Sequence, residues 1–237
     1  YYRFADDFWI NHQIGHFAVE LGQWNQAIRF FSCALALRPS NSAALADLGA
    51  ALAESGLLDD AIAVFRESVR LLGPDDAGGH NNLGHALLHK GALDEAIAEH
   101  REAVRLWPRY ADFRYNLGLA LRDTGLWEEA AAEFRETIRL KPDDEEAHND
   151  LAWLLAERKE CSDAEATEAV ALARRAVELV PQEPANRNTL GLALYRVRNW
   201  SAAVAALQKS TALSGGGDAE DWLLLAMAHW QLGNKEA

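Results

Sequence analysis

The residues with the clearest potential for chemistry are two histidines in "FWINHQIGH" (8–16). His12 and His16 are four residues apart, and this spacing places both imidazoles on one face of a helix. Helical zinc proteases use the same spacing, but they have a glutamate where this chain has Gln13. Zinc also needs a third protein ligand, and the sequence pattern places none. We therefore expect no metal site at this pair.

The rest of the sequence contains no recognisable catalytic or cofactor motif. It has no GxxxxGK[ST] phosphate loop and no GxSxG nucleophile motif, and the acidic residues around "SGGGD" (214–218) would repel phosphate. Cys33 and Cys161 form no CxxC pair. Acidic pairs such as Asp59 and Asp60 lie at predicted helix starts, where they favour the helix dipole. We expect a non-catalytic chain with no cofactor.

The composition narrows the classes of partner and compartment. With 36 acidic and 23 basic residues, the chain has a formal net charge of -13, which suits neither nucleic acid nor anionic lipid. The longest apolar run, "WLLLAMA" (222–228), is too short to span a bilayer. Two cysteines favour a reducing compartment. We expect a cytoplasmic location, no membrane or nucleic-acid partner and, because the chain begins at Tyr1, a piece of a longer protein.

Small residues recur at a regular interval that indicates an internal repeat. One series follows a Leu or Ile, at intervals of 34, 35, 34, 34, 39 and 35 residues: Gly15, Gly49, Gly84, Gly118, Ala152, Gly191 and Ala226. A second series shows the same long fifth step: Ala27, Ala61, Ala96, Ala130, Ala169 and Ala203. Two series that agree indicate tandem units, in which small residues let paired helices approach closely.

Each unit has the pattern of two amphipathic helices. In the second unit we expect helices over 42–55 and 58–72. Glycines just after the first helix suit a C-cap; they are Gly22, Gly56, Gly91, Gly125 and Gly233. Prolines end the second helix; they are Pro39, Pro74, Pro108, Pro142 and Pro181. Polar residues in "PSNSAA" (39–44) and "PDDEEA" (142–147) favour the start of the next first helix.

The unit "NNLGHALLHKGALDEAIAEHREAVRLWP" (81–108) and its relatives at 115–142 and 46–73 resemble the tetratricopeptide repeat (TPR). The resemblance implies an all-α solenoid of antiparallel helix pairs that forms a right-handed superhelix, with the first helix of each pair on the concave side. After a flank at 1–7, the expected units are 8–41, 42–76, 77–110, 111–144, 145–183 and 184–218, and 219–237 forms a partial seventh unit or a capping helix.

Three departures from the repeat carry information. The fifth unit has extra residues within "ERKECSDAEATEAV" (157–170), which predicts a longer turn. The sixth unit has Arg198 where the others have the turn glycine. The last helix has an apolar face that includes Trp222, Leu225 and Met227, with no second helix to cover it. Solenoid ends need polar caps, so we favour a chain cut within a repeat over a capping helix.

The resemblance implies that residues flanking the Leu–Gly pair line a peptide groove. In this chain these are Trp9, His12, His16, Asp47, Asn81, Asn82, His85, Tyr115, Asn116, Asn149, Trp153, Asn188 and Tyr195. The resemblance implies a ladder of asparagines, one per repeat, that holds a peptide backbone. Asn82 and Asn116 stand at its place just before the core leucine. Asn149 and Asn188 lie one residue earlier, so the ladder is broken. The alternative is that these asparagines bridge neighbouring helices.

The aromatic and basic residues indicate which kind of segment the groove would bind. Trp9, Tyr115, Trp153 and Tyr195 would be groove anchors, whereas three tryptophans early in the second helix are expected in the core: Trp24, Trp127 and Trp200. The groove lacks the Lys and Arg with which TPR domains grip acidic chaperone tails. Its carboxylates favour a neutral or basic segment.

The favoured function is a scaffold that binds an extended peptide or partner segment in its concave groove. One alternative is a regulatory or recruiting appendage of a larger signalling enzyme, because "ADDFWINHQIG" (5–15) and "DWLLLAMAHWQLG" (221–233) resemble TPR tails of bacterial Ser/Thr kinases. Another is self-association through the C-terminal face with Trp222, Leu225 and Met227.

Overall fold

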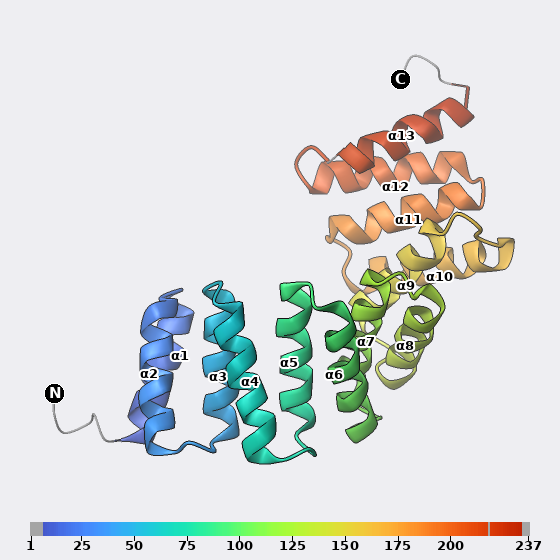
Figure 1. Ribbon diagram of the computed structural model, residues 1–237. Coiled ribbons are helices and arrows are strands. Elements are labelled where there is room, and N and C mark those ends of the chain that lie inside the picture. Colours follow the sequence, from blue (N-terminus) through green and yellow to red (C-terminus); the bar gives the residue numbers. More distant parts are fainter. Residues whose placement is uncertain (1–6, 218, 234–237) are drawn as a thin grey trace. The chain divides into compact units, whose positions relative to one another are not determined.

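A computed structural model of the chain describes residues 7–217 and 219–233. The chain forms two compact units, residues 1–124 and 125–237. Within the described residues the only regular elements are thirteen α-helices (Figure 1). Their predominance confirms the all-α class.

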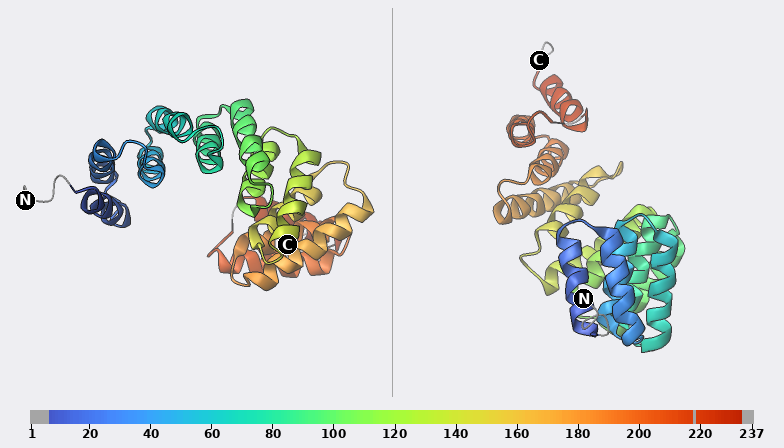
Figure 2. Two further views of the ribbon diagram at one scale, coloured as in Figure 1. Left: turned by 90° about the horizontal axis from the view of Figure 1, so that it is seen from below. Right: turned by 90° about the vertical axis from the view of Figure 1, so that its left-hand side faces the viewer.

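The first unit contains seven helices that pack in chain order, and the earliest of them are seen nearly end-on in the left panel of Figure 2. They are α1 (Phe8–Glu20), α2 (Trp24–Leu37), α3 (Ser42–Glu54), α4 (Leu58–Leu72), α5 (Ala77–Lys90), α6 (Leu93–Leu106) and α7 (Ala111–Asp123). The second unit contains α8 (Trp127–Leu140), α9 (Glu145–Glu157), α10 (Asp163–Leu179), α11 (Pro184–Arg196), α12 (Trp200–Leu213) and α13 (Ala219–Gln231). Odd-numbered helices thus begin at 8, 42, 77, 111, 145, 184 and 219.

The helix ends follow the local chemistry that the sequence indicates. Asn41 and Asp144 cap α3 and α9 by accepting a hydrogen bond from the third helical N–H. The expected C-cap glycines adopt positive φ, as at Gly56 (84°) and Gly91 (81°), where a Cβ would be strained. Each of the five predicted prolines lies two residues beyond the end of a second helix. Glycine and proline therefore set the helix lengths.

Within each compact unit, the two series of small residues lie in the contact between paired helices. All twelve are buried; they are Gly15, Ala27, Gly49, Ala61, Gly84, Ala96, Gly118, Ala130, Ala152, Ala169, Gly191 and Ala203. A Cβ at Gly15 would overlap the ring of Phe31, and one at Gly49 would overlap Phe65. At Gly191 it would lie 2.5 Å from Cγ of Leu207. The side chain of the second helix thus occupies the space that the glycine leaves.

The fifth helix pair differs as predicted in its longer turn and also in its second helix. The turn covers residues 158–162, and α10 has 17 residues where α8 has 14. Ser162 and Glu165 form a reciprocal capping box at the start of α10. Arg158 pairs with Glu128 and Glu165, at 2.7 and 3.0 Å. These contacts fix the inserted residues in place.

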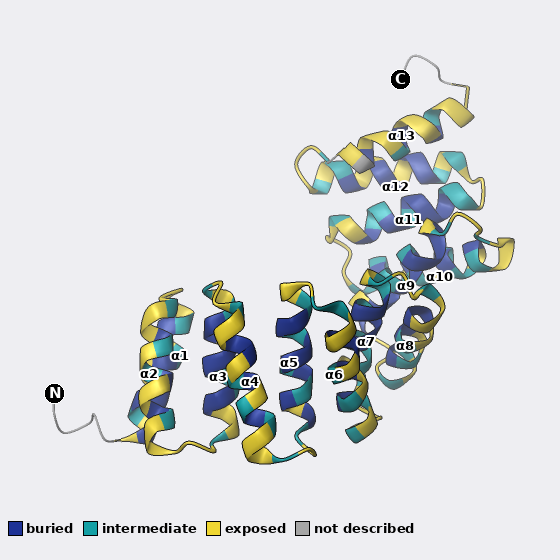
Figure 3. Ribbon diagram, in the orientation of Figure 1, coloured by how far each residue is buried: buried dark blue, intermediate teal, exposed yellow. Residues whose placement is uncertain are grey.

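The last described helix, α13, buries one side and leaves much of its surface exposed (Figure 3). Leu225 and Ala228 pack in the core against α12, so Leu225 is not available to a partner, contrary to expectation. Trp222 and Met227 are exposed. Residues 234–237 and Asp218 lie outside the described part of the chain. Among the described helices, none combines the length and apolar character needed to cross a bilayer.

Candidate functional site

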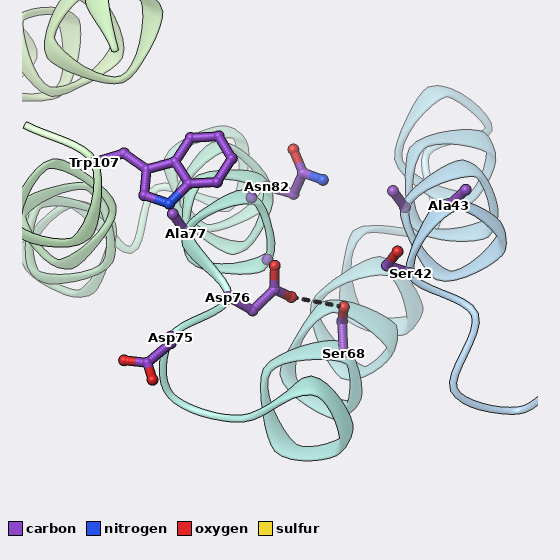
Figure 4. A pocket seen from close by; sticks show the side chains of 11 residues that line it. Ser42, Ala43, Ser68, Asp75, Asp76, Ala77, Asn82 and Trp107 are labelled. Carbon is purple, nitrogen blue, oxygen red and sulfur yellow. Dashed lines mark hydrogen bonds between the residues drawn. The ribbon is translucent and has the colours of Figure 1, made fainter. Parts of the chain in front are cut away.

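One face of α3 forms the centre of the candidate site in the first unit. Ala43, Ala46 and Asp47 lie at spacings of three and four residues, so they share this face. On one side of it, α3 and α5 enclose a pocket of about 340 Å³ (Figure 4). On the other side Asp47 meets two histidines of α1.

The pocket is lined by small and polar residues from α3, α4 and the start of α5, with Trp107 at its edge. Figure 4 shows the amide of Asn82 and the carboxylate of Asp76 directed toward the space between α3 and α5. Asp76 accepts a hydrogen bond from Ser68 Oγ at 3.2 Å. No hydrogen bond occupies the Asn82 amide within the described residues, although it is half-buried. Asn82 is thus free to bind a ligand.

Two glycines lie at the start of α5 beside this pocket, and one of them leaves room for the Asp76 carboxylate. A Cβ at Gly79 would overlap the Asp76 carboxylate, and Gly78 lines the pocket beside it. Glycine within a helix costs about 1 kcal/mol relative to alanine, and at Gly79 the close Asp76 carboxylate explains why a glycine is used. "PDDAGG" (74–79) carried this signal, and the sequence reasoning missed the contribution of Asp76 and Trp107.

The histidine pair at the start of the chain meets a carboxylate from the next repeat. Asp47 Oδ2 lies 2.8 Å from His12 Nε2 and 3.1 Å from His16 Nε2. His12 is buried, stacked on Phe8, and edge-on to His16. The sequence pattern placed no third side chain beside this pair. Asp47 lies there because residues 35 positions apart occupy neighbouring helices of successive repeats.

The asparagine ladder takes a different form from the expected one. Asn116 Nδ2 donates to Oδ1 of Asn81 at 2.9 Å, joining α7 to α5. Asn81 is buried, so it does not line an open groove. Asn116 also bonds His85, whose pKa is lowered mainly by burial and further by the His89 charge, against the raising effect of this bond. Asn116 fits the helix-bridging alternative, and Asn82 alone faces the pocket.

A buried histidine that the sequence reasoning did not single out lies behind this network. His100 on α6 faces Gly84, where Phe31 and Phe65 face their glycines. It is fully buried, and neither ring nitrogen has a hydrogen-bond partner within the described residues. Burial, with a smaller effect of the His85 charge, lowers the pKa of His100 to about 3. Its imidazole is therefore neutral at pH 7.

The expected groove residues of the second unit are largely engaged within the protein. Asn188 Nδ2 donates to Asp221 Oδ1 at 2.5 Å, which joins α11 to α13. Tyr195 packs on Trp200, with ring centroids 4.8 Å apart. Asn149 and Trp153 are half-buried, and Asn149 Oδ1 has no partner within the described chain.

The exposure of the aromatic side chains differs from the prediction. Trp9 is 58% exposed, with the Arg38 guanidinium 5.3 Å from its ring centroid, whereas Tyr115 is half-buried. The prediction that three tryptophans belong to the core was wrong, because all three are half-buried at the start of their helices: Trp24, Trp127 and Trp200. An indole there covers the edge of a helix pair instead of filling its centre.

Sequence comparison identifies the repeat. A profile described as tetratricopeptide repeat matches residues 69–111, 82–145, 115–184 and 188–237. A second profile of the same description matches residues 18–80. The chain belongs to the tetratricopeptide repeat family. A search of curated protein sequences finds no match.

Solved TPR structures resemble the chain in fold. MamA is 27% identical, with a TM-score of 0.59 over 74% of this chain and 92% of its own. TTC0263, a thermophilic TPR protein of Thermus thermophilus, is 25% identical, with a TM-score of 0.62 over 79% and 99%. YrrB, titled a TPR protein with an unusual peptide-binding site, is 19% identical, with a TM-score of 0.65 over 84% and 97%. TPR membership and these neighbours support a protein-interaction scaffold.

Proposed function

We propose that the first unit binds an extended, neutral or basic segment of a protein partner along α3 and α5. The observation that carries this proposal is the pocket in which the Asn82 amide and the Asp76 carboxylate face the same space. An amide can both donate to and accept from a peptide backbone. The carboxylate favours a Lys or Arg side chain of the segment.

The surroundings of the pocket also favour a neutral or basic segment. Asp75 adds a second carboxylate at the outer edge, and no Lys or Arg is among the described lining residues. The indole of Trp107 is 54% exposed at the rim and offers a face to a cation or an aliphatic stem. The small side chains of Ala43 and Ala46 leave room for a main chain between α3 and α5. In this role the chain has no catalytic step.

The test begins with a random library of short peptides, selected on the immobilised chain and scored for charge. We expect enrichment of peptides with Lys or Arg and depletion of acidic ones. For an enriched peptide, Asn82→Ala and Asp76→Asn should each weaken binding about tenfold, the value of one lost polar contact. Fluorescence anisotropy of the labelled peptide measures both.

Matched controls separate the pocket from general effects of charge and helix composition. Asn25→Ala on the exposed face of α2 and Asp60→Asn in the first turn of α4 alter the same residue types outside the pocket. These variants should bind as the unaltered chain does. Enrichment of acidic peptides, or equal affinities for Asn82→Ala and Asn25→Ala, would refute the proposal.

A further inference from the structure

The surroundings of the α1 histidine pair differ from those of the other pair in the chain. His12 Nε2 and His16 Nε2 approach one carboxylate oxygen of Asp47, at 2.8 and 3.1 Å. All three potential ligand atoms lie within 4.8 Å of one another. His85 and His89 have the same spacing on α5, but the described structure places no such carboxylate beside them. The cluster therefore depends on the residue contributed by α3.

We propose that His12, His16 and Asp47 bind a divalent transition-metal ion that joins α1 to α3. Two neutral imidazoles and one carboxylate are a ligand set that suits zinc, cobalt and nickel. Without metal, His12 Nε2 shares a hydrogen bond with Asp47 Oδ2, and His16 Nε2 lies 3.1 Å from the same oxygen. With metal, each neutral imidazole carries its proton on Nδ1, so the Nε2 lone pairs and the Asp47 oxygen are directed to the ion.

The two distances from the histidine nitrogens to the Asp47 oxygen suit such an ion. Bonds of about 2.0–2.1 Å give neighbouring ligand atoms about 2.9 Å apart in an octahedral site and about 3.3 Å apart in a tetrahedral one. The two histidine-to-aspartate distances, 2.8 and 3.1 Å, lie close to the octahedral value.

The packing around the cluster holds one ligand rigidly and leaves another open to solvent. The His12 side chain is 10% exposed, nearly parallel to the Phe8 ring and in contact with the Phe31 ring. The side chains of His16 and Asp47 are 44% and 28% exposed. Because packing already holds His12 in place, less side-chain freedom is lost when the ion binds. The open side gives the ion a path of entry and leaves coordination positions for water.

Zinc chloride and cobalt chloride added to the chain after chelator treatment are the probes for this proposal. Titration calorimetry should give one zinc ion per chain with a Kd at or below about 10 µM. At about 100-fold excess over Kd, zinc should raise the melting temperature of the chain by about 5 °C. Cobalt should give visible d–d absorption bands, which report coordination by protein ligands.

Variants of the three residues decide whether this cluster holds the ion. His16→Ala and Asp47→Ala should each weaken zinc binding by about 100-fold or more and remove the cobalt bands, because each removes a direct ligand. His89→Ala, which alters an exposed histidine on α5, is the control and should leave both readouts unchanged. Circular dichroism without metal checks that each variant is folded.

A second readout does not depend on the stability of the variants. In imidazole ¹H–¹⁵N spectra of the unaltered chain, which has 8 histidines, zinc should shift the Nε2 resonances of His12 and His16 and leave the others in place. Affinity unchanged in Asp47→Ala, or shifts spread over all histidines, would overturn the proposal. So would an unaltered chain that binds zinc no more tightly than His16→Ala.

Discussion

At the scale of single residues, the repeat determines where a side chain lies, but its neighbour determines what it does. Asn82 and Asn116 occupy equivalent places in successive repeats, yet Asn82 faces a pocket while Asn116 bonds Asn81. His100 is a further example, because it stands where Phe31 and Phe65 stand in the preceding repeats. Its two ring nitrogens, unpaired within the described residues, make it a weak point of the first unit.

Replacing His100 with phenylalanine should stabilise the protein. The change removes two buried polar atoms that lack partners in the described structure, each costing about 1–3 kcal/mol, and restores the ring that faces glycine elsewhere. We expect an increase of a few degrees in melting temperature at pH 7, measured by circular dichroism. The reciprocal change, Phe65→His, should lower it; a lower melting temperature for His100→Phe would contradict this account.

The same residue should make stability depend on pH. Burial lowers the pKa of His100 from 6.5 to about 3, so the unfolded chain binds this proton before the folded chain does. Stability should therefore fall as the pH falls from about 6.5 toward 3, by at most about 1.4 kcal/mol per pH unit from this group. Urea unfolding at neutral and mildly acidic pH should show a smaller loss in His100→Phe than in the unaltered chain. Equal losses would show that other groups dominate.

At the scale of elements, glycine, proline and capping residues predicted the helix ends well because they act through local backbone chemistry. The insertion in the fifth helix pair was also located from the sequence alone. The pocket was not, because it depends on where the 73–76 loop places Asp76 relative to α3. Likewise, the contact of Asp47 with two α1 histidines arises from packing between repeats, which spacing within one helix does not reveal.

The turn between α11 and α12 carries backbone strain at the position where the other repeats have a turn glycine. Arg198 takes the place of the turn glycine and adopts a φ of 59°, the one positive φ of a non-glycine residue in the described chain. Arg198→Gly should increase the free energy of unfolding by about 1 kcal/mol, because glycine adopts this conformation without a Cβ clash. Urea unfolding at pH 7 measures the change.

Arg198→Ala separates backbone strain from loss of the arginine side chain. Alanine retains the Cβ, so this variant should gain little or nothing relative to the unaltered chain. A gain in Arg198→Ala equal to that in Arg198→Gly would show that the side chain, and not the φ angle, limits the stability of this turn.

At the scale of the whole molecule, the repeat family and the class of fold were predictable because seven equivalent segments reinforce one another. Partner identity is not encoded in this way, since it depends on the few residues that differ between repeats. The expected link to a larger signalling enzyme stays a prediction, which the full reading frame would test. Self-association also stays a prediction, now with a redefined surface: Leu223, Met227 and Trp230 are exposed along α13, while Leu225 is buried.

If this α13 surface binds a second copy of the chain, the average mass should rise with concentration. Leu223→Glu combined with Met227→Glu should remove the rise, because charged side chains oppose burial of the face. Light scattering across a micromolar concentration series measures the mass, and Leu71→Glu, which alters an exposed leucine on α4, is the control. A constant monomer mass for the unaltered chain would exclude self-association.

The long fifth helix pair has a consequence for how the chain reaches its native state. Tandem helix pairs of similar sequence can mispair during folding, with one helix docking on the partner of another repeat. The 17-residue α10 and the 158–162 turn, with Arg158 bound to Glu128 and Glu165, do not match the dimensions of any other described pair. A helix from another repeat therefore cannot reproduce the packing of this pair. We expect the fifth pair to oppose mispairing between repeats while the chain folds.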